Sequence, residues 1–205
     1  MNTDDTNPDA ESNGTVNATV GEATAGSPAD TGIVSRMLRA AKLDSELYEE
    51  VEADKSSLGQ ATAVVVLSSL AAGVGNFTNG GMGMLIVGTL AALGSWYIWA
   101  FLTYIIGTRL LPEPQTRADH KELLRTTGFS SAPGLIRVLG VIPGMTGIVY
   151  FIASLWMLIA MVISVRQALD YTGTGRALAV CAGGWVVQGV VIYVILQAFA
   201  LPEGA

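Results

Sequence analysis

The residues that could carry chemistry in this 205-residue chain are few and isolated from one another. His120 is its one histidine and Cys181 its one cysteine, so we predict neither an internal disulfide nor a zinc-type metal site. The glycines do not follow a Walker or dinucleotide-binding pattern, and no Asp pair or His–Ser dyad lies in an apolar stretch. These residue types therefore predict a protein that is not an enzyme and needs no cofactor.

Two polar residues stand out because they lie inside long apolar stretches. An arginine at mid-membrane, such as Arg137, costs roughly 2.5–3.5 kcal/mol unless it is paired, hydrated or extended toward the interface. No acidic residue lies in these stretches. Arg137 and the nearby Arg125 are therefore candidate contacts for a lipid headgroup or another anion; the alternative for Arg137 is a side chain that extends to the membrane surface. Gln188 is a candidate polar contact between helices.

Five apolar stretches must position these residues. They are Leu58–Phe77, Met82–Thr108, Ala132–Met145, Gly147–Val165 and Ala177–Leu201. A helix needs about 20 mainly apolar residues to cross a bilayer, a length that all but the third stretch reach or approach. The third stretch is short and ends at Pro143-Gly144, so a re-entrant half-helix competes with a short, tilted crossing.

The basic residues decide between these alternatives. Ten of the eleven Lys and Arg residues fall into three clusters: Arg36, Arg39, Lys42 and Lys55; Arg109, Arg117, Lys121 and Arg125; and Arg166 and Arg176. Five crossings place all three clusters on one side, which the positive-inside rule makes cytoplasmic. A re-entrant third stretch would carry the last cluster outside. We therefore predict an all-α bundle of five spans in the cell membrane, with the N-terminus in the cytoplasm and the C-terminus outside.

The chain before the first span divides into a tail and a helical segment. Residues 1–32 hold six acidic residues, no basic residue and no aromatic one, which predicts a disordered acidic tail. Residues 33–57 are expected to form cytoplasmic amphipathic helices, the first with an apolar face and basic residues suited to an anionic membrane surface. The second helix is acidic and should face water or a partner. The candidate partner surface consists of Glu46, Tyr48, Glu49 and Glu50.

The approach to the third stretch carries a family resemblance. Gly128 and Phe129, followed by Pro133, form a Gly-aromatic-x-x-x-Pro element that enters a short third span. Together with five predicted spans and Trp156 in the fourth, this element resembles the Yip family of Ypt/Rab-interacting membrane proteins, in its prokaryotic and archaeal branch. The resemblance implies a five-span membrane domain over residues 58–201 and a role in membrane organisation.

One departure from the family bears on the expected partners. Eukaryotic members resemble one another in an Asp-Leu-Tyr-Gly-Pro element, whereas Glu46-Leu47-Tyr48 is followed here by Glu49-Glu50. Small-GTPase binding is therefore not predicted. The leading hypothesis is a scaffold that contacts membrane lipids and a protein partner or a second copy of itself, and not nucleic acid. The alternatives are a small transporter or channel subunit, with Arg137 and Gln188 lining a polar route, and a lipid-binding, bilayer-shaping protein.

Overall fold

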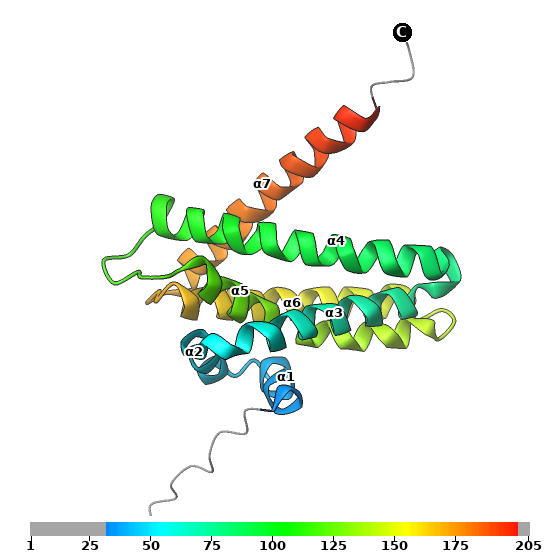
Figure 1. Cartoon of the computed structure of the whole chain (residues 1–205), viewed down its shortest axis with the longest axis horizontal. Helices are drawn as coiled ribbons and strands as arrows, with labels where there is room; N and C mark the ends of the chain where they lie inside the picture. The colour runs from blue at the N-terminus through cyan, green and yellow to red at the C-terminus, as the bar shows by residue number, and fades with distance from the viewer. Residues whose placement is uncertain (1–31, 201–205) are drawn as a thin grey trace, which may run out of the picture. The chain divides into compact units, whose positions relative to one another are not determined.

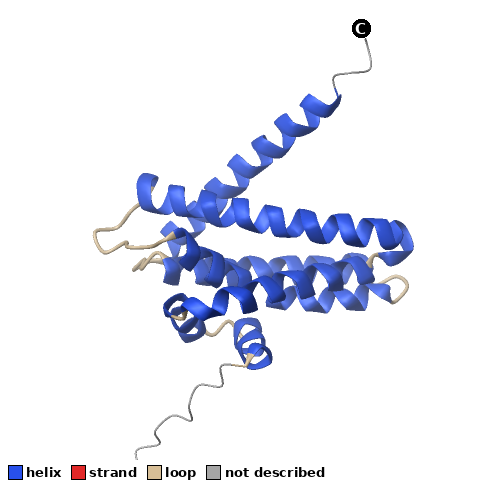
Figure 2. Ribbon diagram, in the orientation of Figure 1, coloured by secondary structure: helices blue, strands red, loops and turns tan. Residues whose placement is uncertain are grey.

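The computed structural model describes residues 32–200, and within that range every regular element is a helix (Figure 1, Figure 2). In chain order the elements are α1 (Ile33–Ala41), α2 (Ser45–Ala53), η1 (Lys55–Ser57), α3 (Leu58–Gly75), α4 (Phe77–Ile105), η2 (Ile106–Leu110), α5 (His120–Phe129), η3 (Ala132–Val141), α6 (Thr146–Ala168) and α7 (Thr174–Ala200). The predicted all-α class is confirmed. The predicted acidic tail lies, except for Gly32, outside the described residues.

Several of these helices have the character of membrane spans. Within the described range, three helical segments are long and apolar enough to cross a membrane: Lys55–Gly75, Gly81–Leu110 and Thr146–Ala168. Large apolar side chains on them stay exposed, such as Leu90 on α4 at 65% and Phe151 on α6 at 70%. Exposed apolar surface on this scale marks a membrane or partner contact.

The chain turns between α3 and α4 at the place that the sequence predicts. The two helices pack against each other, and the regular geometry of α4 is interrupted at Gly81. Gly81 has φ 61° and ψ −167°, a conformation that glycine adopts readily and other residues do not. The first predicted stretch ends at Phe77 and the second begins at Met82, so this break lies in the gap between them.

The third apolar stretch forms a different kind of helix from the one expected. Ala132–Val141 is a ten-residue 3-10 helix, η3, packed against α3 and α6. Gly134 and Gly140 of η3, six residues apart, meet Ser68 and Gly75 of α3, which are seven residues apart. Gly128, near the end of α5, meets Ala61, seven residues before Ser68. Six residues complete two turns of a 3-10 helix and seven complete about two turns of an α-helix. The small residues of α3 and the glycines of η3 therefore keep facing each other.

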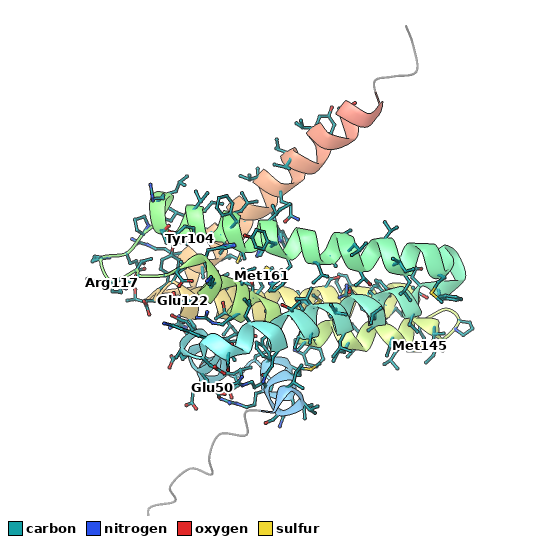
Figure 3. The ribbon with its side chains drawn as sticks, viewed as in Figure 1. Glu50, Tyr104, Arg117, Glu122, Met145 and Met161 are labelled. Carbon is teal, nitrogen blue, oxygen red and sulfur yellow. The ribbon has the colours of Figure 1, made fainter. Side chains whose placement is uncertain are left out.

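This packing gives η3 a direction. It runs parallel to α3, because its glycine contacts advance from Ser68 at Gly134 to Gly75 at Gly140. A 3-10 helix rises about 2.0 Å per residue, so ten residues extend about 20 Å, farther than the same residues would in an α-helix. Met145, just beyond η3, lies at the opposite end of the bundle from Glu122, which precedes it (Figure 3).

The basic residues of α1 face α2 rather than the membrane. Arg36 is 1% exposed and forms ion pairs with Glu50 and Asp54 at 2.8 and 2.9 Å. Arg39 also pairs with Glu50. The expectation that these two bases face an anionic membrane surface was therefore wrong. The tight turn after α1 brings the acidic helix α2 alongside, and its carboxylates neutralise both guanidinium groups.

Candidate functional site

The family motif packs the junction between α5 and η3 against α3. A Cβ atom added at Gly128 would lie 2.8 Å from the Cβ of Ala61, so a larger residue would push the two segments apart. Phe129 is fully buried, and Pro133 is buried in the first turn of η3, where its missing N–H costs no helical hydrogen bond. These three motif residues thus act on packing.

Arg125 connects α5 to the end of α2. Its side chain is only 4% exposed; its Nε donates to the carbonyl oxygen of Val51 at 3.0 Å, and a terminal nitrogen donates to that of Glu52. The last carbonyls of a helix have no partner within the helix, so the guanidinium satisfies two of them. These hydrogen bonds engage Nε and Nη2 of Arg125 within the fold. Lipid contact by Arg125 stays a prediction.

The proposed partner surface on α2 divides into a buried and an exposed part. Tyr48 is fully buried in an apolar cluster with Phe129 and faces the bundle. Glu46 and Glu49 are exposed, and Glu49 accepts a hydrogen bond from Nε2 of Gln167 at 2.7 Å. Glu50 is held by α1. A partner on this side of α2 would therefore meet Glu46 and Glu49.

An acidic cleft of about 470 Å³ lies beside this surface, where α2, α5 and the end of α6 meet. Its lining consists of Glu49, Glu52, Ala53, Glu122, Arg166, Gln167, Asp170 and Tyr171. The single cation among them, Arg166, donates from Nε to the carbonyl oxygen of Tyr171 at 3.3 Å. Four carboxylates and one guanidinium leave the cleft negatively charged.

Burial and neighbouring carboxylates shift the pKa of Glu52. Burial, followed by the charges of Asp170 and Glu122, raises the pKa of Glu52 to about 7. A cation that entered the cleft would favour the ionised form and lower this pKa again. The acidic cleft is therefore suited to a positively charged ligand. Sequence reasoning missed it because its carboxylates come from separate elements, with no spacing signal to link them.

The second polar feature surrounds Arg137 inside the bundle. Its Nε donates to the carbonyl oxygen of Gly134 at 3.1 Å and its Nη2 to Oγ of Ser68 at 2.8 Å. Its own carbonyl lies beside Gly75, at the end of α3, and Ser68 lies seven residues earlier on that helix. The side chain therefore points back along α3 toward the middle of the bundle, and not outward from the end of α3.

Two cavities meet at Arg137. One, of about 290 Å³, extends toward Asn76 and Gly81 and is lined by Tyr150; the other, of about 270 Å³, extends toward three tryptophans, Trp96, Trp99 and Trp185. Both cavities share Arg137, Ser69 and Ala92. We call the first the polar cavity and the second the tryptophan cavity.

Gln188 lines the tryptophan cavity with Arg137. Its Nε2 donates to Oγ of Ser95 at 2.5 Å, which joins α7 to α4. Gly184, one turn earlier on α7, lies against Trp99, where an added Cβ would be 3.0 Å from the ring. The structure thus brings together Arg137 and Gln188, the two intramembrane polar residues that the sequence singled out.

Long apolar helices with exposed apolar side chains and inward-facing polar groups define an α-helical membrane protein. Comparison with protein families makes this more specific: the family model of the Yip1 domain matches residues 45–196, from α2 into α7. The chain therefore belongs to the Yip1 domain family, and the resemblance drawn from the sequence is confirmed. No curated protein and no solved structure matches the chain.

Proposed function

We propose that this Yip-family protein is a non-enzymatic scaffold of the cell membrane whose cytoplasmic face binds a basic segment of a protein partner. The acidic cleft carries this proposal. It is built from α2, α5 and the end of α6, and it holds four carboxylates with one cation. Complementary charge speeds the encounter with a basic partner and selects against acidic ones.

A protein side chain fits the cleft better than a bound metal ion. Among the described residues, no group of three or more His, Cys, Asp or Glu side chains is arranged to hold a metal. The carboxylates instead line a cavity of about 470 Å³, which is large enough for a lysine or arginine side chain. Neighbouring Glu46 on α2 is exposed and extends the negative surface beyond the cleft.

The proposed topology has five crossings, with the N-terminus in the cytoplasm and the C-terminus outside. Three crossings are the long apolar segments, and η3 and the 27-residue helix α7 supply the other two. The parallel run of η3 along α3 supports a crossing rather than a re-entrant loop, because its two ends lie at different levels of α3. The acidic cleft then lies on the cytoplasmic side with the three basic clusters.

Cysteine accessibility tests this topology. In a Cys181→Ala background, a cysteine at Thr146 should react with a membrane-impermeant maleimide added outside the cell. Cysteines at Thr116 and Thr172 should react only after the membrane is opened. External labelling at Thr172 would contradict five crossings and place the end of α6 outside.

Binding of a defined basic peptide tests the scaffold hypothesis. We expect a fluorescent lysine- and arginine-rich peptide to bind the purified full chain and to lose roughly tenfold affinity in a Glu52→Gln, Glu122→Gln variant, since hydrogen bonds to charged groups are worth about 1.5–3 kcal/mol. An Asp4→Asn, Asp5→Asn variant removes the same number of carboxylates from the N-terminal tail, outside the cleft lining. Equal losses in both variants would show that the cleft is not the docking site.

One observation favours the transporter alternative. Arg137 and Gln188 line the same cavity, as that hypothesis requires. Gln188, however, is engaged with Ser95 in an interhelical hydrogen bond. Flux of a small anion into proteoliposomes that disappears in Arg137→Gln, with assembly unchanged, would support transport over the scaffold.

A further inference from the structure

We propose that Arg137 binds the phosphate of an anionic phospholipid, with the headgroup in the polar cavity and an acyl chain in the tryptophan cavity. This lipid site is separate from the acidic cleft, and it goes beyond the scaffold function. Only the leaflet from which the lipid enters rests on the proposed topology, which makes it the outer one.

The charge of Arg137 is the first argument. The chain has no acidic residue between Lys55 and Pro112 or between Leu123 and Leu169, so none of the apolar stretches around Arg137 supplies a carboxylate. Its polar contacts within the described range are the neutral Ser68 hydroxyl and the Gly134 carbonyl. A guanidinium group in an apolar setting requires a counter-charge or water. An anion from outside the chain meets this requirement.

The direction of the side chain is the second argument. An arginine near the end of a span usually extends to the closer interface. Arg137 instead turns back toward Ser68, where the polar and tryptophan cavities meet. The guanidinium is therefore held where a group that occupies both cavities would contact it.

The two cavities lie at different depths in the bundle, as the headgroup and the acyl chain of a phospholipid do in a membrane. The polar cavity includes Asn76 at the end of α3, Ser69 and Tyr150, and so reaches from the end of the bundle to Arg137. The tryptophan cavity beyond it combines its three indole rings, Met157 and Met161 with the polar side chains of Ser95, Thr127, Ser131 and Gln188. A headgroup near the end of the bundle, a phosphate at Arg137 and a hydrocarbon chain along the indole rings would therefore follow one another.

Small residues leave room for this ligand. Gly73, Gly81 and Gly88 line the polar cavity, and an added Cβ at Gly81 or Gly88 meets no atom within 4 Å. A leucine at Gly88 can therefore be accommodated by the fold while it fills space that the lipid would use. Gly94 provides the matched position on the same helix, since it also has no neighbour within 4 Å but lines neither cavity.

Native mass spectrometry of the full chain, purified in a neutral detergent, tests the site. The probes are phosphatidylglycerol, phosphatidylcholine and inorganic phosphate. We expect the wild type to retain one phosphatidylglycerol, and Arg137→Gln to bind it roughly tenfold more weakly or worse, as the loss of charged hydrogen bonds predicts. Arg109→Gln, which removes an exposed arginine of η2, should bind like the wild type.

The glycine pair protects the test against misfolding of the arginine variant. Gly88→Leu should lose the bound phosphatidylglycerol with Arg137 intact, whereas Gly94→Leu should keep it. Equal retention by Gly88→Leu and Gly94→Leu, or equal losses in Arg137→Gln and Arg109→Gln, would overturn the proposal. Equal retention of phosphatidylcholine would also overturn it, because the site would not select negative charge. Displacement of phosphatidylglycerol by inorganic phosphate, without selective lipid binding, would indicate a free-anion site instead.

Discussion

Arg36 and Arg137 show how a positive charge is treated in two parts of this protein, the helices α1 and α2 and the membrane body. Arg36, on α1, has Glu50 and Asp54 within 2.9 Å and a third partner, the Oε1 atom of Gln60, at 2.9 Å. Arg137, on η3, has a serine hydroxyl and a backbone carbonyl. The difference separates an arginine whose charge is neutralised within the fold from one whose charge is left for a ligand.

The two arginines differ because of the chain around them. Fourteen and eighteen residues separate Arg36 from its carboxylate partners, and a single turn brings α2 back to it. Among residues 32–200 Arg137 has no equivalent neighbour, because the segments around it are apolar stretches without acidic residues. Four predictions test this comparison, from the largest expected effect to the smallest.

Removal of the Arg36 charge should have the largest effect. Arg36→Met leaves Glu50 and Asp54 without their cation, and loss of one partner of a buried ion pair costs about 3–5 kcal/mol. We expect about 3 kcal/mol, the lower end of that range, because the two carboxylates are 22% and 28% exposed. Thermal unfolding in detergent measures the effect. The triple variant with Glu50→Gln and Asp54→Asn should recover part of the loss; no recovery would contradict the ion-pair explanation.

Added side-chain volume between α3 and η3 should lower stability nearly as much as Arg36→Met does. Gly75→Ala places a methyl group against the main-chain carbonyl of Arg137, which cannot move as a side chain would. Overpacking costs about 1–3 kcal/mol, and contact with backbone favours the upper end. Gly83→Ala is the matched control on α4, where an added Cβ meets nothing within 4 Å. Similar melting temperatures for the two variants would mean that η3 does not pack this closely on α3.

Glu52 should make stability depend on pH. Its pKa is about 7 in the folded chain, above the ordinary value of about 4.3. The folded state therefore holds this proton more tightly, and stability falls as the pH rises from about 4.3 to 7. Glu52→Gln removes this loss and should be more stable than the wild type at pH 8, by about 1 kcal/mol after allowance for solvent screening, but equal to it at pH 4. A difference that is the same at both pH values would contradict a perturbed Glu52.

The smallest effect is expected for Arg137 when no lipid is present. In a detergent free of anionic lipid, Arg137→Met loses hydrogen bonds to two neutral groups but removes a charge that no carboxylate balances. These contributions oppose each other, so stability should stay within about 1 kcal/mol of the wild type. Melting curves with and without phosphatidylglycerol measure this, and the lipid should stabilise only the wild type. A loss as large as that of Arg36→Met would show that Arg137 is primarily structural.

Patterns within short stretches of sequence predicted the local structure well. Apolar stretches with polar interruptions predicted the all-α class, and the helices expected over residues 33–57 are present as α1 and α2. The motif of Gly128, Phe129 and Pro133 pointed to the correct family. Each of these signals depends on neighbours within a few residues, which the sequence displays directly.

Contacts between distant segments were harder to predict. A 3-10 helix at Ala132–Val141 was not expected, because its apolar composition also suits an α-helix. Its form is consistent with the register of its glycines on the small residues of α3, which no local pattern encodes. The partners of Arg36 were missed for a related reason, since an amphipathic pattern gives the direction of a charge but not what will pack against it.

The sequence by itself determined that this chain forms apolar helices and where these helices are interrupted. It also determined that no acidic residue in the apolar stretches neutralises Arg137. Both follow because hydropathy and charge are properties of the residues themselves. Only the tertiary structure decided which charges are neutralised and which surround a cavity. Glu52, Glu122 and Asp170 become one acidic cleft, and Arg137 comes to lie where two cavities meet, because packing brings distant elements within a few ångströms of one another.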